Sequence, residues 1–334
     1  MKVLVTGAGG FIGGHLARRL LQQGHEVATF QRGHYACLES EGISTIRGDV
    51  ADSAAVIEAI QGVDAVFHVA ALASVWGPRA DFERCNVLGT QNVIAGCRHH
   101  RVSKLIFTSS PSVVFDGNHQ QGIDEQTPYP RRYLAHYSRT KAIAEQDVLA
   151  ANDARLATVA LRPHLVWGPG DRHLIPRILD RARTGKLRLI DAPGTRIDAT
   201  FIDNAVDAHI AALDALSVGS ACSGRPYFIA NGEPMPAHQL IGGILEAAAL
   251  DAVAPSVSPR FARAMATVLE WFHSIPGVSG EPLLTRFTAS QLSTSHWFDL
   301  SAARRDLAWS PRVTTEEGLQ ALAREFTGEK EVLR

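Results

Sequence analysis

A short apolar run that breaks into closely spaced glycines at the start of the chain constrains the fold more than any other feature. Val3 to Val5 is too short for a helix and rich in β-branched residues, so it predicts a strand buried on both faces. Gly7, Gly10 and Gly13 follow, at spacings that permit a tight turn, close approach of a pyrophosphate and close packing of a helix. This order of strand, turn and helix predicts a dinucleotide site at a helix N-terminus.

The residues after the glycines support that interpretation. A helix is expected from Phe11 to Gln23, because leucine and alanine recur on one face and Gly24 supplies a typical stop. Phe11 and Ile12, at the start of the helix, are expected to lie against the cofactor. The alternative is an ordinary glycine-rich turn, which the position between strand and helix disfavours.

Composition sets the class of protein. The chain has 334 residues, 46% hydrophobic and 20% charged, with a formal net charge of −1. These values predict one large α/β domain with a smaller lobe, and they lack the basic excess of a nucleic-acid binder. The chain leads directly into a core strand, and no apolar run reaches the ~18 residues of a membrane span, so we expect a cytoplasmic protein. Its four cysteines show no metal-like spacing, and no metal is expected.

The end of the second predicted strand, His25 to Phe30, indicates the cofactor. An NAD enzyme usually places an acid there for the ribose 2′-hydroxyl, whereas a cation suits the 2′-phosphate of NADP. Gln31, Arg32 and Gly33 include no acid, so NADP(H) is the expected cofactor. Arg32 as a solvated surface residue remains the alternative.

A tyrosine and a lysine are predicted to share one face of a helix from about Leu134 to Ala151. Tyr137 and Lys141 are four residues apart, and they follow a predicted strand, Lys104 to Thr108, that ends in serines. Moving a tyrosine pKa from ~10 to about 7 requires ~4 kcal/mol, to which an ammonium can contribute. Tyr137 is therefore the expected proton donor or acceptor, Lys141 its supporting cation and Ser110 the hydroxyl that orients a carbonyl, with Ser109 and Ser112 as competitors.

These motifs together resemble the extended branch of the short-chain dehydrogenase/reductase superfamily, and within it the 3β-hydroxysteroid dehydrogenase group. The resemblance covers nearly the whole chain and includes Arg162-Pro163 and the segment Thr200 to His209. It implies an α/β fold, a Rossmann doubly wound parallel sheet with a smaller C-terminal substrate lobe. It also implies a homodimer formed through the helices at about 82–100 and 134–151.

The resemblance also implies the remaining cofactor contacts. Asp49 would meet the adenine, although a turn aspartate is the alternative, and Pro163, His164 and Val166 would line the nicotinamide pocket. No catalytic role is expected for His164. The full expected set is Gly7, Gly10, Phe11, Ile12, Gly13, Arg32, Asp49, Val50, Ala70, Ala71, Thr108, Tyr137, Lys141, Pro163, His164 and Val166.

The expected domains are an NADP-binding domain at 1–173 with core strands returning near 197–230, a substrate lobe at 174–196 and 231–300, and a C-terminal helical segment at 301–334. In the lobe, large apolar residues recur at helical spacing from Phe261 to Ile275. This stripe either packs onto the lobe or forms a lid or membrane-surface helix, so peripheral membrane contact is possible.

Short segments, among them Asn231 to Pro234 and Leu284 to Phe287, are similar to bacterial 2-alkyl-3-oxoalkanoate reductases of long-chain olefin biosynthesis. That similarity implies NADPH-dependent reduction of a hydrophobic β-keto acid with two long alkyl chains, and assembly with enzymes of the same pathway. A 3β-hydroxysteroid dehydrogenase and a non-catalytic NADP-binding sensor or assembly subunit are the alternatives.

Overall fold

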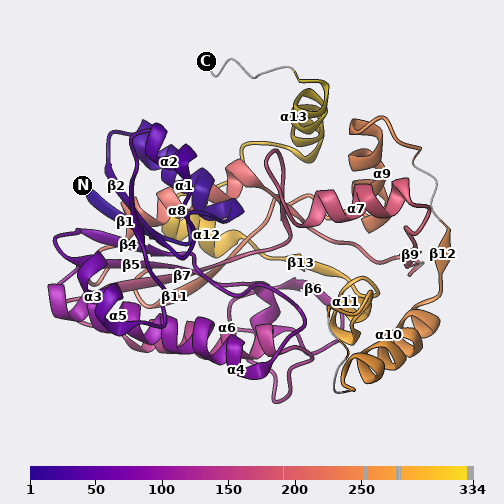
Figure 1. Cartoon of the computed structure of the whole chain (residues 1–334), viewed down its shortest axis with the longest axis horizontal. Helices are drawn as coiled ribbons and strands as arrows, with labels where there is room; N and C mark the ends of the chain where they lie inside the picture. Colours follow the sequence, from indigo (N-terminus) through magenta and orange to yellow (C-terminus); the bar gives the residue numbers. More distant parts are fainter. Residues whose placement is uncertain (191, 252–254, 276–277, 279, 329–334) are drawn as a thin grey trace.

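The computed structural model describes residues 1–190, 192–251, 255–275, 278 and 280–328. Within these residues the centre is a seven-stranded parallel sheet in the order β11, β7, β5, β4, β1, β2, β3 (Figure 1). The strands are β1 (Lys2–Thr6), β2 (Glu26–Gln31), β3 (Ser44–Arg47), β4 (Ala65–His68), β5 (Lys104–Thr108), β7 (Ala157–Pro163) and β11 (Arg225–Ile229). The order reverses between β1 and β4, which opens a crevice at the carboxyl ends of the strands. The predicted doubly wound parallel sheet is confirmed.

Helices cover both faces of this sheet (Figure 1). One layer contains α1 (Phe11–Gln22), α8 (Ile202–Ala215) and α12 (Ser301–Leu307), and the other contains α3 (Ser53–Ile60), α5 (Gly89–His100) and α6 (His136–Ala150). Successive residues of a strand point to opposite faces, so Val3 and Val5 join the first core whereas Leu4 joins the second. A strand with two buried faces needs an apolar side chain at every position, which explains the unbroken run at the N-terminus.

The helix predicted from Phe82 to His100 is present, but its first half is π-helical rather than α-helical. The structure has α4 (Arg79–Phe82), then a π-helical turn η1 (Glu83–Leu88), and only then α5. Buried Asn86 lies in that turn, accepts from Leu72 N at 2.7 Å and donates to Thr140 Oγ1 at 3.0 Å. The wide turn therefore connects the loop after β4 to α6, and no apolar periodicity marks it.

Two other helix starts are set by the residue before the helix. Asp52 caps α3 by accepting from Ala54 N and Ala55 N. Helix α6 begins at His136 rather than Leu134, because Ala135 has an extended backbone with φ −137° and ψ 149°. The shift leaves the tyrosine in the first turn of the helix.

The chain beyond β7 builds the lobe at the right of Figure 1 from short elements. These are α7 (Leu174–Arg183), β9 (Leu189–Ile190), α9 (Ala237–Ala247), β12 (Ser256–Val257), α10 (Pro259–His273) and α11 (Arg286–Gln291). Of the strands expected to return near 197–230, β11 joins the central sheet, whereas β10 (Thr200–Phe201) pairs with β8 (Val166–Trp167) in a separate small sheet. The C-terminal segment forms α12 and α13 (Thr315–Thr327), and residues 329–334 of the predicted range lie outside the described residues.

Helix α10 settles one of the alternatives left by the sequence. Its small residues Ala262 and Ala266 are buried and pack with Ala289 of α11, whereas the large apolar residues of the stripe face solvent. The possibility that the stripe packs onto the lobe is therefore wrong. Short side chains on the inner side let α10 approach α11 closely, and that contact leaves the bulky side outward.

Candidate active site

The glycine turn after β1 leaves no room for side chains. A Cβ at Gly7, whose φ is +75°, would lie 2.7 Å from Ala70 Cα, and a Cβ at Gly13 would lie 2.5 Å from Gly7 O. The loop after β4 thus passes directly over the turn, which explains why it is built of alanines. Backbone exposed in this way at a helix N-terminus forms a cradle that a pyrophosphate can approach.

A cavity of about 1000 Å³, here called the cofactor cavity, extends from this turn across the carboxyl ends of the strands. It is large enough for a dinucleotide. Every predicted site residue but one lines it, namely Gly7, Gly10, Phe11, Ile12, Gly13, Arg32, Asp49, Val50, Ala70, Ala71, Thr108, Ser110, Tyr137, Lys141, Pro163 and Val166. The residue that it does not include is His164.

Charged groups of opposite sign lie at the far end of the cofactor cavity. Burial opposes ionisation of Asp49, but its bonds from Ala51 N at 3.0 Å and Arg84 at 2.8 Å prevail, and the pKa of the carboxyl is lowered. Arg32 lines the same end with an exposed side chain. The cations here favour an anionic group on the ligand.

Tyr35 is a cavity residue that sequence reasoning missed. A Cβ at Gly9 would come within 2.2 Å of its ring and a Cβ at Gly33 within 2.9 Å, so the ring lies across both glycines. Tyr35 lines the cofactor cavity next to the phosphate turn. An aromatic residue soon after the second strand, between two glycine-containing segments, is the only signal that the sequence offered.

At the other end of the cavity, α6 brings Tyr137 and Lys141 together. Lys141 is buried, donates from Nζ to Thr108 O at 2.6 Å and lies 3.9 Å from the centroid of the Phe107 ring. Burial lowers the pKa of Lys141 to about 7, against the opposing charge of Glu145. The ammonium is thus held against strand β5 rather than exposed to solvent.

Tyr137 has its hydroxyl next to Ser110. Burial raises the pKa of Tyr137, and the hydrogen bond with Ser110 lowers it. The pKa of Tyr137 is raised overall, because burial outweighs the hydrogen bond with Ser110, and the lowering of this pKa by Lys141 stays a prediction. Additional positive charge near the phenol is needed before phenolate is favoured at neutral pH.

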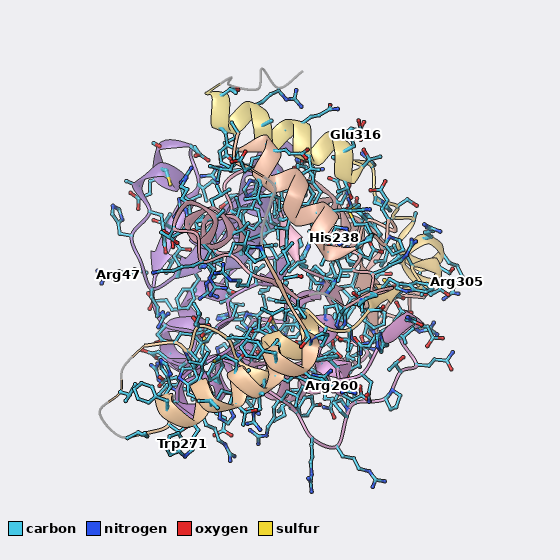
Figure 2. All side chains as sticks on the ribbon, turned by 90° about the vertical axis from the view of Figure 1, so that its right-hand side faces the viewer. Arg47, His238, Arg260, Trp271, Arg305 and Glu316 are labelled. Carbon is cyan, nitrogen blue, oxygen red and sulfur yellow. The ribbon has the colours of Figure 1, made fainter. Side chains whose placement is uncertain are left out.

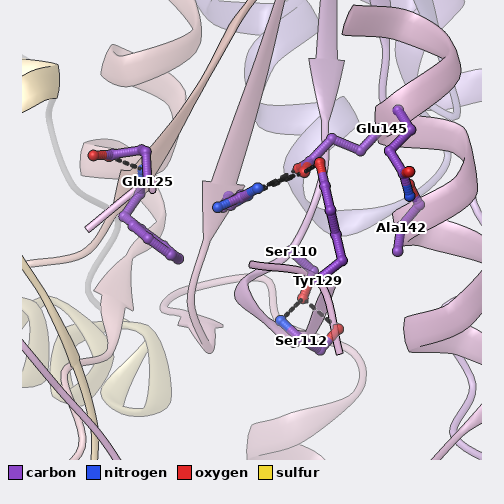
Figure 3. Close-up of polar contacts among 9 residues, drawn as sticks. Ser110, Ser112, Glu125, Tyr129, Ala142 and Glu145 are labelled. Atoms are coloured by element: carbon purple, nitrogen blue, oxygen red, sulfur yellow. Dashed lines mark hydrogen bonds and ion pairs between the residues drawn. The ribbon is translucent and has the colours of Figure 1, made fainter. Parts of the chain in front are cut away.

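The structure separates the three serines that follow β5. Ser110 Oγ lies 3.0 Å from Ser112 Oγ and accepts from Ser112 N at 3.2 Å (Figure 3). Ser109 and Ser110 both line the cofactor cavity, but Ser110 is the one bonded to the tyrosine. Ser112 therefore orients the Ser110 hydroxyl from behind.

One turn beyond the lysine, a buried ion pair joins α6 to β7. Glu145 accepts from Arg162 Nη2 at 2.6 Å and from Tyr129 Oη at 2.6 Å, and both charged side chains are almost fully buried (Figure 3). The guanidinium lies 5.1 Å from the Phe228 ring centroid. Glu145 is a residue that was not predicted, although its position four residues after Lys141 on the same helix is a signal that could have identified it. This network fixes α6 and β7 relative to each other.

A second cavity of about 290 Å³, here called the lobe cavity, adjoins the first. Leu165 and Leu174 line both cavities, and Leu165 adopts φ +43°, a conformation that bulky side chains rarely take. Apolar residues of the lobe form much of its wall, including Ile178, Leu187, Ile197, Leu240, Ile241, Ile244 and Phe287. An apolar compartment therefore meets the cofactor cavity at a strained leucine.

His164 lines this lobe cavity rather than the cofactor cavity. Its Nδ1 lies 2.8 Å from Asp198 O, and burial lowers its pKa to about 4, so the imidazole is neutral at pH 7. A neutral imidazole that donates from Nδ1 keeps Nε2 as an acceptor. His164 thus lies on the wall of the second cavity, and its contact with a nicotinamide stays a prediction.

Comparisons with known proteins agree with this geometry. A model described as the 3-beta hydroxysteroid dehydrogenase/isomerase family matches residues 4–256. The 2-alkyl-3-oxoalkanoate reductase of Stenotrophomonas maltophilia (strain K279a) is 48% identical over 324 residues, covering 96% of this chain and 98% of that protein. A protein of the same name from Shewanella oneidensis is 44% identical over 326 residues, covering 95% of this chain and 84% of that protein.

A solved structure of MoeE5 in complex with UDP-glucose and NAD has a TM-score of 0.73 and 26% identity, covering 98% of this chain and 99% of that one. The likeness spans the sheet and the lobe together. The chain belongs to the 3-beta hydroxysteroid dehydrogenase/isomerase family and is a nicotinamide-dependent oxidoreductase of the extended short-chain dehydrogenase/reductase type.

Proposed function

We propose that the protein reduces the keto group of a long-chain 2-alkyl-3-oxoalkanoate to the 3-hydroxy acid with NADPH. The observation that carries this proposal is the contact between the two cavities, because the serine and tyrosine of the cofactor cavity lie close to an apolar compartment that can hold alkyl chains. The names of the two bacterial relatives give the substrate class.

The proposed reaction assigns one task to each polar side chain. Ser110 donates to the substrate carbonyl and orients it, aided by its contact with Ser112. Tyr137 gives its proton to the oxygen as negative charge develops there. Lys141, bonded to Thr108 O, holds the ribose side of the cofactor and supplies charge for the tyrosine. The bound dihydronicotinamide supplies the hydride.

NADPH is proposed over NADH because of the end of β2. Arg32 lines the cofactor cavity where an acid would serve the ribose of NAD, and neither Gln31 nor Gly33 is acidic. A charge-assisted bond to a phosphate contributes roughly 1.5 to 3 kcal/mol. Arg32→Ala should therefore weaken NADPH at least tenfold in a fluorescence titration and leave NADH nearly unchanged. Equal binding of both cofactors by the unaltered protein would contradict the assignment.

A 3β-hydroxysteroid dehydrogenase is the second candidate, favoured by the name of the family that matches the chain. The non-catalytic sensor is less well supported, because a sensor does not need Ser110, Tyr137 and Lys141 on one cavity wall. A turnover assay with NADPH separates the three. Branched β-keto acids should be reduced faster than a rigid sterol ketone; the reverse order selects the steroid enzyme, and no turnover of any ketone selects the sensor.

A further inference from the structure

Helix α10 carries an unusual concentration of apolar side chains on the protein surface. Trp271 is 68% exposed and Val268 59%, and the same side of the helix also presents Phe261, Met265 and Phe272. Ile275 extends this row just beyond the helix. Single exposed apolar residues need no explanation, but a contiguous row of this kind marks an interaction surface. We call these six residues the α10 face.

The outward direction of the α10 face is fixed by contacts on the opposite side. Ala262 and Ala266 are buried against α11, and Glu270 accepts from Arg286 N and Arg286 Nε, each at 2.6 Å. Rotating the helix to bury the α10 face would break the ion pair and expose the alanines. The apolar row is therefore a stable surface of the folded chain.

The exposed charge that borders this face is positive. Figure 2 shows α10 lying across the surface with Arg260 labelled near its first turn and Trp271 near its last. Arg260 is exposed at the border of the apolar row, whereas Glu270, the acid of this helix, is buried and paired on the opposite side. An exposed aromatic and aliphatic row bordered by a cation is a pattern of helices that lie in the interface of anionic membranes.

The lobe cavity also reaches the protein surface. Leu283 and Leu292 line that cavity and are themselves 61% and 38% exposed, so apolar surface extends from the cavity to the outside. At the end of α10 the His273 ring packs edge-on against Trp76, whose neighbour Val75 is part of the cavity wall.

We propose that α10 docks the protein, as an interfacial helix, on a lipid surface that carries anionic headgroups. The apolar row enters the boundary between headgroups and acyl chains, and Arg260 meets the anionic headgroups. Across the described residues no helix is long and apolar enough to cross a bilayer, which agrees with contact from one side. A second copy of the chain is the competing occupant, and the experiment below distinguishes the two. The proposal does not depend on the identity of the substrate.

Sedimentation with vesicles tests the proposal on the full chain. The protein should sediment with vesicles of phosphatidylcholine mixed with phosphatidylglycerol and much less with phosphatidylcholine alone. Phe272→Asp should abolish sedimentation, and Arg260→Ser should weaken it roughly fivefold, as expected for the loss of one interfacial charge. Val218→Asp is the matched control, since Val218 is 49% exposed but lies after α8, and it should sediment like the unaltered protein.

NADPH titration of each variant verifies that the altered proteins are folded, because none of these positions lines the cofactor cavity. Failure of the unaltered protein to sediment with anionic vesicles overturns the proposal. Equal loss of sedimentation in Val218→Asp and Phe272→Asp overturns it as well, because the loss would then come from the added negative charge and not from its place on the α10 face. A dimer that Phe272→Asp converts to monomers, without vesicle binding, assigns the face to a second copy instead.

Discussion

Helices α6 and α10 have the same length, 15 residues, and opposite surroundings. The first buries polar residues, including Thr140, Lys141 and Glu145, whereas the second exposes a row of large apolar ones. Each buried polar group of α6 named here has a partner outside the helix, on η1, β5 or β7. From the hydrophobic pattern alone, α10 would be expected to bury its large apolar residues and α6 to expose its polar ones. Which side of a helix is buried depends on the partners that the rest of the fold offers. Helices that bury polar residues or expose large apolar ones depart from the usual pattern, and such departures mark functional surfaces.

The largest expected effect tests whether the buried polar groups of α6 depend on those partners. Arg162→Leu leaves the Glu145 carboxyl buried without its partner, and should lower the free energy of unfolding by about 3 to 5 kcal/mol in urea denaturation. The double variant Arg162→Leu/Glu145→Leu removes both charges and should lose clearly less than Arg162→Leu alone. The single variant Glu145→Leu completes the comparison. If the loss of unfolding free energy in the double variant equalled the sum of the losses in Arg162→Leu and Glu145→Leu, the two residues would not be coupled as their geometry indicates.

The next effect concerns chemistry on α6. Tyr137→Phe removes the hydroxyl that contacts Ser110 but keeps the ring, so NADPH binding should be nearly unchanged. Loss of the proton donor should lower kcat by roughly 10² or more, the scale of general acid catalysis. Steady-state rates and cofactor titration measure the two separately. Full activity in this variant would remove the tyrosine from the reaction.

A smaller effect should appear in the pH dependence of stability. The pKa of Lys141 is about 7 in the fold, below its usual value of 10.5, because burial disfavours the ammonium. Between these values the unfolded chain binds the proton and the fold does not, so stability contributed by this group rises with pH, by at most about 1.4 kcal/mol per pH unit.

The comparison that isolates this group is Lys141→Met, measured without cofactor between pH 7 and 9. The unfolding free energy of the unaltered protein minus that of Lys141→Met should become more positive as the pH rises across that range. Below about pH 7 the difference should stop changing, since both states then hold the proton. A constant difference at all pH values would mean that the lysine keeps an ordinary pKa in the fold.

The sequence predicted the nucleotide half of the molecule well, for physical reasons. A side chain at Gly13 would collide with backbone a few residues away, and one at Gly7 would collide with a single neighbouring loop. The spacing of the glycines in the sequence is therefore enough to predict the turn. The π-turn at Asn86 depends on Leu72 and Thr140, which lie on separate segments, and spacing within the helix does not show it. The direction of α10 likewise follows from alanines that pack with the next helix, α11, and periodicity within α10 does not show that contact.

The lobe was predicted least well for the same reason. His164 adjoins Pro163, which lines the cofactor cavity, yet its imidazole bonds to Asp198 O and lines the lobe cavity. Adjacent residues of an extended segment point to opposite sides, and the sequence does not say which side holds which ligand. The glycine turn of the cofactor cavity depends on contacts of nearby backbone, whereas the wall of the lobe cavity is formed by side chains from scattered segments.

The last and smallest prediction separates the cavity wall from the exposed helix. Each buried methylene contributes about 0.8 kcal/mol, so kcat/KM for 2-alkyl-3-oxoalkanoates should rise several-fold for each pair of added methylenes until the cavity is full. Ile241 lines the lobe cavity and Phe272 does not. Ile241→Trp should therefore bring the plateau to a shorter chain, whereas Phe272→Trp, the matched control on α10, should leave the dependence unchanged in assays without lipid. An earlier plateau in Phe272→Trp would mean that α10 folds over the substrate as a lid, and indifference of both variants would mean that the alkyl chains bind elsewhere.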